Sequence, residues 1–260
     1  MDEMAEDARN ADNLKLAAGR ARNIAIVLSA GRGSRMHTKQ AKQYLDLCGK
    51  PVIAWSLQAF EDFGRIDDVI LVSAPDDIAY CRSEIVEKYR FRKVRAIVPG
   101  GAERYLSVWE GLKAASRMLN GDSGSGGMRE SCILIHDGAR PLVDGNIISR
   151  CLDDALRHGA CVAAMPVKDT IKVADPSGFA VRTPDRRSLW QIQTPQAFSF
   201  SLVYEAYRKL IAEGITDVTD DAMVVERMSA AHVRLTEGSY RNIKITTPED
   251  LEIAELFLRK

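Results

Sequence analysis

The chain has 260 residues, of which 46% are hydrophobic, and its formal net charge is zero. This composition supports a buried core and excludes a wholly disordered chain. The balanced charge argues against a generally basic nucleic-acid-binding protein, and no apolar run approaches the roughly 18 residues that a membrane-spanning helix needs. We therefore expect neither a nucleic-acid partner nor a membrane partner.

The composition along the chain indicates a single domain. Residues 1–22 are charged and rich in alanine, and we expect a poorly ordered extension ahead of one domain over residues 23–260. The five cysteines form no CxxC pair. Cys132, Cys151 and Cys161 lie in or beside apolar segments, which is typical of reduced core thiols in a cytoplasmic protein.

Strand-like apolar segments alternate with segments of helical spacing. We expect strands at 24–30, 67–73, 94–98, 132–137 and 160–167. We expect helices at 51–60, 76–90, 103–119, 199–213 and 219–229, and a last helix capped at Thr247. This alternation predicts an α/β fold with a mostly parallel central sheet, in which ligands bind beyond the carboxyl ends of the strands.

Residues 168–195 interrupt the alternation. Short alternating pieces flank the turn residues Asp175 to Gly178, which predicts a β-hairpin that projects from the sheet. Residues 120–130 are rich in glycine and serine, and we expect a plain surface loop there.

The first candidate site follows the first expected strand, in IAIVLSAGRGSRMHTKQAKQYL (residues 24–45). A dinucleotide-binding fingerprint would need a third glycine at Met36, and the spacing of a P-loop is absent. The remaining interpretations are an ordinary turn at Gly31 and Gly33, or backbone amides that approach an anion beside Arg35 and Lys42.

The second candidate site is CILIHDGARP, which places Asp137 at the end of an expected strand. A carboxylate at this position can hold a hard cation that in turn holds phosphates, but it can equally be a turn or cap residue. Strand alternation turns His136 away from Asp137, so we expect a packed histidine rather than a catalytic one.

Two further segments carry weaker signals. Gly100, Gly101 and Ser107 lie where a strand passes into a helix, and they could meet a base or a sugar or form an ordinary turn. Lys244 lies between two isoleucines of an expected strand. An inward lysine there would need an anion, whereas an outward one would belong to the polar face of an edge strand.

The order of the motifs is more specific than any one of them. They are S-A-G-R-G-S-R-M, A-K-Q-Y-L, G-G-A-E-R-x-x-S-V, H-D-G-A-R-P, P-V-K-D-T-I-K, D-R-x-S-L-W, Q-T-P-Q-A-F, T-D-D-A and N-I-K-I-T-T-P-E-D-L. Over about residues 23–258 the chain resembles the 2-C-methyl-D-erythritol 4-phosphate cytidylyltransferase family, the nucleotide-transfer enzymes of non-mevalonate isoprenoid synthesis.

This resemblance implies a Rossmann-like nucleotidyltransferase fold with a mostly parallel sheet and a projecting β-arm, here residues 168–195. It implies transfer of a cytidylyl group from CTP to a sugar-alcohol phosphate with release of pyrophosphate, and bound Mg²⁺. It also implies a homodimer in which the arm clasps the second subunit and serves that subunit's site.

The resemblance also implies roles for individual residues. Arg35 and Lys42 would stabilise the transition state. The residues that would meet CTP are Ala30, Gly31, Gly33, Gly101 and Ser107. Those that would hold the acceptor are Asp137, Arg140, Thr170, Arg186 and Lys244, with Asp137 also the candidate metal ligand.

The expected chemistry fits this set of residues. The nucleophile would be an acceptor phosphate, whose second pKa is ~6, so it is mostly ionised at neutral pH and needs no general base. Catalysis would then consist of positioning and cationic stabilisation of the α-phosphoryl group. Two departures from the family pattern are Ala41, where proline is usual, and Gly138, where alanine is usual. We expect them to loosen the local backbone and to affect rate more than activity.

Three other functions compete with cytidylyl transfer to the erythritol acceptor. A cytidylyltransferase that uses ribitol 5-phosphate is the nearest, although HDGARP, PVKDTIK and DRxSLW favour the erythritol enzyme. A catalytically idle nucleotide-binding protein is disfavoured because the charged site residues are retained. A nicotinamide oxidoreductase is disfavoured by Met36.

Overall fold

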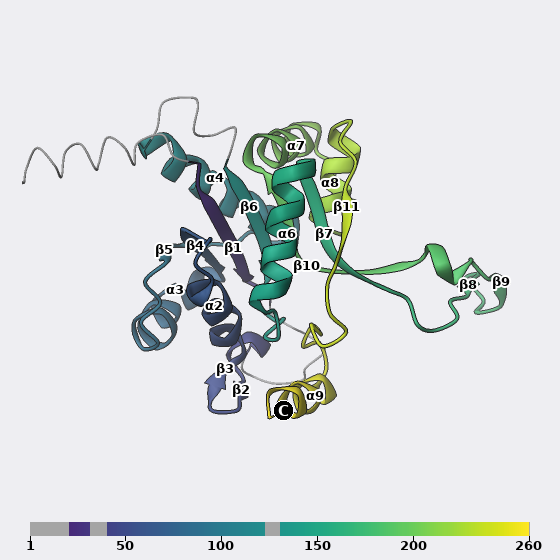
Figure 1. Cartoon of the computed structure of the whole chain (residues 1–260), viewed down its shortest axis with the longest axis horizontal. Coiled ribbons are helices and arrows are strands. Elements are labelled where there is room, and N and C mark those ends of the chain that lie inside the picture. Colours follow the sequence, from purple (N-terminus) through teal and green to yellow (C-terminus); the bar gives the residue numbers. More distant parts are fainter. Residues whose placement is uncertain (1–20, 32–40, 123–130, 260) are drawn as a thin grey trace, which may run out of the picture.

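The computed structural model describes residues 21–31, 41–122 and 131–259 (Figure 1). Two of the predicted site residues, Gly33 and Arg35, lie outside these ranges. Within them, no helix is both long enough and apolar enough to cross a membrane.

A seven-stranded sheet forms the centre of the molecule, as predicted for an α/β fold. In spatial order its strands are β11 (Arg234–Glu237), β7 (Ala160–Pro166), β10 (Trp190–Ser199), β6 (Cys132–Asp137), β1 (Asn23–Ser29), β4 (Asp68–Ser73) and β5 (Val94–Pro99). β10 runs antiparallel to its neighbours β6 and β7, and the other neighbouring pairs are parallel. The carboxyl ends of β1, β4, β5 and β6 therefore lie along one edge of the sheet.

Helices cover both faces of the sheet (Figure 1). On one face lie α2 (Val52–Asp62) and α6 (Gly145–His158); on the other lie α4 (Arg104–Asp122), α7 (Phe200–Glu213) and α8 (Asp221–Met228). Successive side chains of β1 point to opposite faces of the sheet and pack in both apolar layers. Ala25 and Val27 belong to one cluster, and Ile24 and Ile26 belong to the other. Burial on both faces explains why the strands read as continuous apolar runs.

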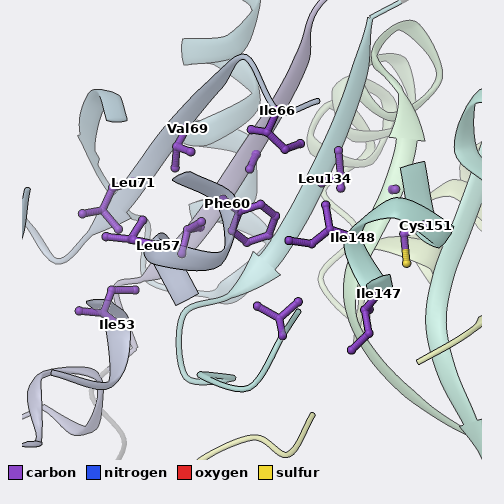
Figure 2. Packing of buried hydrophobic residues seen from close by; sticks show 14 of the residues in the cluster. Ile53, Leu57, Phe60, Ile66, Val69, Leu71, Leu134, Ile147, Ile148 and Cys151 are labelled. Atoms are coloured by element: carbon purple, nitrogen blue, oxygen red, sulfur yellow. The ribbon is translucent and has the colours of Figure 1, made fainter. Parts of the chain in front are cut away.

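Figure 2 shows the cluster on the α2 and α6 side of the sheet. Leu57 and Phe60 of α2, Ile148 of α6 and Leu134 of β6 meet there, each at most 1% exposed. Full burial of side chains of this kind stabilises a fold by about 1.5–3 kcal/mol each. This packing fixes β6, and with it the position of Asp137 at the end of that strand.

The predicted strands and helices are confirmed in most places, but the sequence did not predict α6, β11 or the sheet strand β10. α6 begins at the cap Asp144, whose carboxylate accepts from Ile147 N at 2.8 Å, and β11 is a short edge strand. The last helix, α9 (Pro248–Leu258), begins with a capping box formed by Thr247 and Asp250, as predicted.

The remaining elements are short. They are the 3₁₀ segments η2 (Lys42–Tyr44), η3 (Pro75–Asp77) and η5 (Arg186–Ser188), the strands β2 (Asp46–Leu47), β3 (Lys50–Pro51), β8 (Val173–Ala174) and β9 (Ala180–Arg182), the helix α3 (Ile78–Tyr80) and the π-helical segment η4 (Cys81–Glu87). The helix predicted at 76–90 is thus a succession of 3₁₀, α and π turns.

The predicted arm projects from the body of the molecule (Figure 1). Its tip is the antiparallel pair β8 and β9, closed by a turn at Gly178 with φ of 87°. One boundary was wrong, because residues 190–195 already belong to β10 of the central sheet and pair in part with β7. The apolar side chains of Phe179 and Val181 are 73% and 62% exposed, so the described part of the chain leaves them uncovered.

Candidate active site

A cavity of about 320 Å³ lies where β1, β5 and β6 end, at the edge of the sheet at which ligands were expected. Most of the predicted site residues line it: Ala30, Gly31, Lys42, Gly101, Ser107, Asp137 and Lys244. Residues from distant parts of the chain therefore meet at one place. The cations Lys42, Arg104 and Lys244 line the cavity, and Arg104 and Lys244 contact the buried carboxylate of Asp137.

Asp137 is the electrostatic centre of the cavity. It is 8% exposed, and its Oδ2 accepts from Lys244 Nζ at 2.8 Å while its Oδ1 lies 3.3 Å from Arg104 Nε. Burial alone would raise the pKa of this carboxyl, but Arg104, Lys244 and Arg140 outweigh burial and hold the pKa well below its usual value. Asp137 is therefore ionised throughout the physiological range.

Arg104, at the start of α4, was not assigned a role from the sequence. Its Nη1 and Nη2 each donate to one oxygen of Asp221 at 2.8 Å, and Asp221 is fully buried. The motif G-G-A-E-R-x-x-S contains Arg104, but the sequence alone does not indicate that this guanidinium reaches Asp137 and Asp221. The T-D-D-A motif likewise held Asp221 without indicating its partner.

Lys42 lies in the short 3₁₀ segment η2 at the mouth of β1. Its Nζ donates to the carbonyl oxygen of Ile245 at 2.7 Å. The next two residues anchor this segment, because Gln43 Nε2 donates to Ser29 O at 2.7 Å and the buried Tyr44 hydroxyl lies 3.3 Å from Ser73 Oγ. These contacts hold the backbone that carries Lys42.

The backbone at Ala41 has a conformation that a proline could also adopt. Its φ is −63°, close to the value that a proline ring would impose. The expected loss of restraint from the absent proline is therefore offset in the folded chain by the buried anchors Gln43 and Tyr44.

Lys244 does not lie in a strand, contrary to the prediction. The segment belongs to no strand of the sheet, and the Ile245 amide donates to Ala139 O at 2.8 Å. Ile245 is buried, and Ile243 packs against the same small cluster under α9. The two isoleucines thus fix the segment while the Lys244 ammonium reaches Asp137, so the inward interpretation of this lysine is the one that holds.

Arg140 is not among the residues that line the cavity. Its Nη1 donates to the carbonyl oxygen of Asn242 at 2.8 Å, which ties the loop after β6 to the segment that carries Lys244. Burial lowers the pKa of this guanidinium, and Asp137 partly opposes that shift. An acceptor-binding role for Arg140 stays a prediction.

His136 is a structural residue, as expected. It is fully buried beside Phe60, and burial lowers its pKa to about 4, so the ring is neutral at physiological pH. Its Nε2 lies 3.2 Å from Arg140 O, which can only accept, so Nε2 carries the proton and Nδ1 accepts from the Thr194 hydroxyl at 3.0 Å. Thr194 Oγ1 also accepts from the Asp137 amide at 3.0 Å, which fixes the end of β6.

The glycine pair after β5 is required by close packing. A Cβ on Gly100 would lie 2.5 Å from Ala30 Cβ and 2.8 Å from Ser107 Oγ. The Gly101 amide donates to Ser107 Oγ at 3.1 Å. The start of α4 is therefore drawn against the end of β1, and this contact closes one wall of the cavity.

Gly138 does not loosen the backbone beside Asp137, contrary to expectation. Its amide donates to Leu28 O at 2.8 Å, and a Cβ there would overlap Ile53 Cδ1 and come within 2.8 Å of the same carbonyl oxygen. The position is a close approach of two strand ends that only glycine fits without movement.

We therefore expect Gly138→Ala to destabilise the protein by about 1–3 kcal/mol, the usual cost of overpacking. In an Ile53→Val background, which removes the overlapping methyl, the cost should be smaller. Urea unfolding measures both, with Gly64→Ala as the control because nothing lies within 4 Å of a Cβ at that position. An equal cost in both backgrounds would contradict this explanation.

The two predicted arm residues are not brought to the cavity within one chain. Thr170 and Arg186 are both exposed, and neither lines the cavity. Arg186 Nη1 donates to Lys168 O at 2.8 Å, which links the two chain segments at the base of the arm. Their predicted role in acceptor binding therefore depends on a second subunit.

The donor set at Asp137 suits one kind of metal site. Within the described residues no group of three or more His, Cys, Asp or Glu side chains could hold a metal ion by itself. Mg²⁺ at phosphate-transfer sites is commonly held by one or two carboxylates together with substrate phosphates and water. Asp137, a single ionised carboxylate on the cavity wall, fits that arrangement.

Comparison with known proteins gives a consistent result. The family model described as IspD, 2-C-methyl-D-erythritol 4-phosphate cytidylyltransferase, matches residues 23–260. The chain is 50% identical to the protein of that name from Lachnospira eligens over 91% of this chain and 99% of the relative. It is 45% identical to the protein of the same name from Caldanaerobacter subterraneus, over 91% and 98% of the two chains.

Solved structures resemble the fold as well. The crystal structure of 4-diphosphocytidyl-2C-methyl-D-erythritol synthase from Anaerococcus prevotii aligns with a TM-score of 0.76 and 32% identity, over 92% of this chain and 99% of that one. That of 2-C-methyl-D-erythritol 4-phosphate cytidylyltransferase from Thermus thermophilus aligns with a TM-score of 0.70 and 29% identity, over 90% and 98%.

Proposed function

The chain belongs to the 2-C-methyl-D-erythritol 4-phosphate cytidylyltransferase family, and from this we propose that it transfers a cytidylyl group from CTP to 2-C-methyl-D-erythritol 4-phosphate, releasing pyrophosphate. The observation that carries the proposal is the cavity at the strand ends, which Lys42, Arg104 and Lys244 line and where Arg104 and Lys244 contact Asp137. Such a concentration of positive charge suits two phosphate-bearing substrates.

The cavity residues divide the work of positioning. The base and ribose of CTP would lie against the wall formed by Ala30, Gly31, Gly101 and Ser107. Lys42 would stabilise the charge that develops on the α-phosphoryl group, as a point charge held on an anchored segment. Arg35, which precedes Lys42 in the sequence, would add a second cation.

The acceptor supplies its own nucleophile. Its phosphate has a second pKa of ~6 and is mostly ionised at neutral pH, so no side chain needs to remove a proton. Lys244 would orient this phosphate from within the chain, and Asp137 would hold Lys244 in place before substrate arrives. Neutral His136, directed away from the cavity, takes no part in proton transfer.

Mg²⁺ would be held by Asp137 together with phosphate oxygens of CTP, and when bound it would neutralise triphosphate charge. We also propose a homodimer, in which the arm of one chain delivers Thr170 and Arg186 to the cavity of the other. The exposed apolar side chains of the arm support this, because a two-stranded hairpin is marginally stable unless it packs on a surface.

The test is a pyrophosphate-release assay with CTP and Mg²⁺ and each of two acceptors. We expect turnover with 2-C-methyl-D-erythritol 4-phosphate and little with ribitol 5-phosphate. Turnover with the ribitol acceptor alone would replace the proposed substrate. Binding of CTP without turnover of either acceptor would indicate a catalytically idle protein.

A further inference from the structure

A polar chain runs from the hydrophobic core to the cavity through residues to which the proposed reaction gives no role. Tyr207 of α7 is fully buried, and its hydroxyl donates to Asp221 Oδ1 at 2.5 Å. Asp221 accepts both Nη groups of Arg104, and Arg104 Nε reaches Asp137 Oδ1 at 3.3 Å. Three of the five N–H donors of this guanidinium are thereby directed by carboxylates on opposite sides of it.

The start of α8, which carries Asp221, is itself held in place. Gln196 of β10 is 1% exposed; its Nε2 donates to Asp220 Oδ2 at 3.0 Å, and its Oε1 accepts from the Ala222 amide at 2.9 Å. Gln196 is thus hydrogen-bonded to the residues on both sides of Asp221. Because β10 pairs with β6, this clamp connects Asp221 to the strand that ends in Asp137.

The arrangement has a direct effect on Asp137. Rotation of a carboxylate about its last torsion is soft, so one ion pair does not fix the plane of the group. Lys244 binds one oxygen of Asp137 and Arg104 the other. Among the described residues, Arg104 is the one of these two cations that a second carboxylate, Asp221, also holds. A lysine in place of Arg104 could not fork to Asp221 and reach Asp137 at the same time.

We propose that Asp221 and Tyr207 are positioning residues, which hold the Arg104 guanidinium so that it orients the Asp137 carboxylate, and through it Lys244, at the substrate cavity. This inference rests on the proposed cytidylyl transfer. It assigns a role in the reaction to two buried side chains that need not contact a substrate.

The decisive comparison is between two tyrosines of the same helix. Tyr207→Phe removes only the hydroxyl that braces Asp221, whereas Tyr204→Phe removes a hydroxyl with no hydrogen-bond partner among the described residues. We expect Tyr207→Phe to lower kcat/KM about three- to tenfold, the effect of one lost hydrogen bond. Tyr204→Phe should stay within about twofold of the unsubstituted enzyme by the same measure, since it loses no such bond.

Arg104→Lys supplies the second part of the test. We expect it to lower kcat/KM at least about tenfold, and we expect Tyr207→Phe to add nothing in that background, because the hydroxyl acts through the guanidinium. Asp221→Asn should resemble Arg104→Lys. If it fails to fold, the tyrosine pair and the double variant still decide.

Each result counts for or against the proposal. If the two tyrosine variants have equal kcat/KM, Tyr207 has only a packing role. The same follows if Tyr207→Phe lowers the thermal midpoint but leaves the kinetic constants unchanged. If the double variant Arg104→Lys/Tyr207→Phe loses kcat/KM by the product of the two single losses, Tyr207 does not act through Arg104. An unsubstituted enzyme inactive with both acceptors would overturn the proposed function and this inference together, whereas an active one leaves the inference alone at stake.

Discussion

Replacing Lys42 by alanine is expected to lower turnover by about 10²–10³-fold, the usual effect of removing one preorganised donor to a charged transition state. The loss should appear mainly in kcat, because the ammonium acts where charge develops rather than where substrate first binds. Steady-state kinetics at saturating CTP and acceptor measures it.

The fold should survive this change. Lys42 is half-buried at the rim of the cavity, and its ammonium donates to the carbonyl oxygen of Ile245 rather than packing in the hydrophobic core. The anchors Gln43 and Tyr44 stay in place. Lys88→Ala serves as the matched control for loss of one lysine, because Lys88 is an exposed residue that directly follows the π-helical segment η4. Turnover of Lys42→Ala near that of Lys88→Ala would remove Lys42 from the catalytic set.

The sequence predicted those parts of the fold that depend on local patterns. Apolar runs marked β1, β4, β6 and β7, whose residues are almost all buried in the central sheet, and β5 at its edge, and caps marked α9. Lys244 was placed in a strand for the same reason, wrongly, since Ile243 and Ile245 pack under α9 instead of joining the sheet. An apolar pattern indicates that residues are buried, but it does not indicate whether a sheet or a helix covers them.

The candidate site divides in a similar way. Asp137 could be found because a strand end is a local feature. Its partners could not, since Arg104 lies 33 residues before it, and Asp221 lies 117 residues beyond Arg104. Contacts at such separations are made by the packing of α4, α7 and α8 on one face of the sheet. Only the folded chain shows that the two acids of T-D-D-A have different tasks: Asp220 caps α8 and Asp221 holds Arg104.

The largest recovery of activity is expected when two inactive variants are mixed. Arg186→Ala removes a predicted acceptor contact on the arm, and Lys42→Ala removes a cation in the body of the chain. If the arm serves the neighbouring subunit, a mixed dimer has one site with both lesions and one site with neither. After complete random exchange half of the dimers are mixed, so activity should rise to ~25% of the unsubstituted enzyme, by two-fold symmetry.

The matched control mixes Lys42→Ala with Lys244→Ala. Both of these side chains line the cavity of the same chain, so every site in a mixed dimer keeps one lesion and no activity should return. Exchange is verified separately by mass spectrometry of differently tagged chains, and light scattering must show a dimer at micromolar concentration. Recovery in the first mixture and none in the control requires Arg186 to act across the subunit boundary. No recovery in either mixture, with exchange verified, would mean that each site is built from a single chain, and the exposed Phe179 and Val181 of the arm would then need another partner.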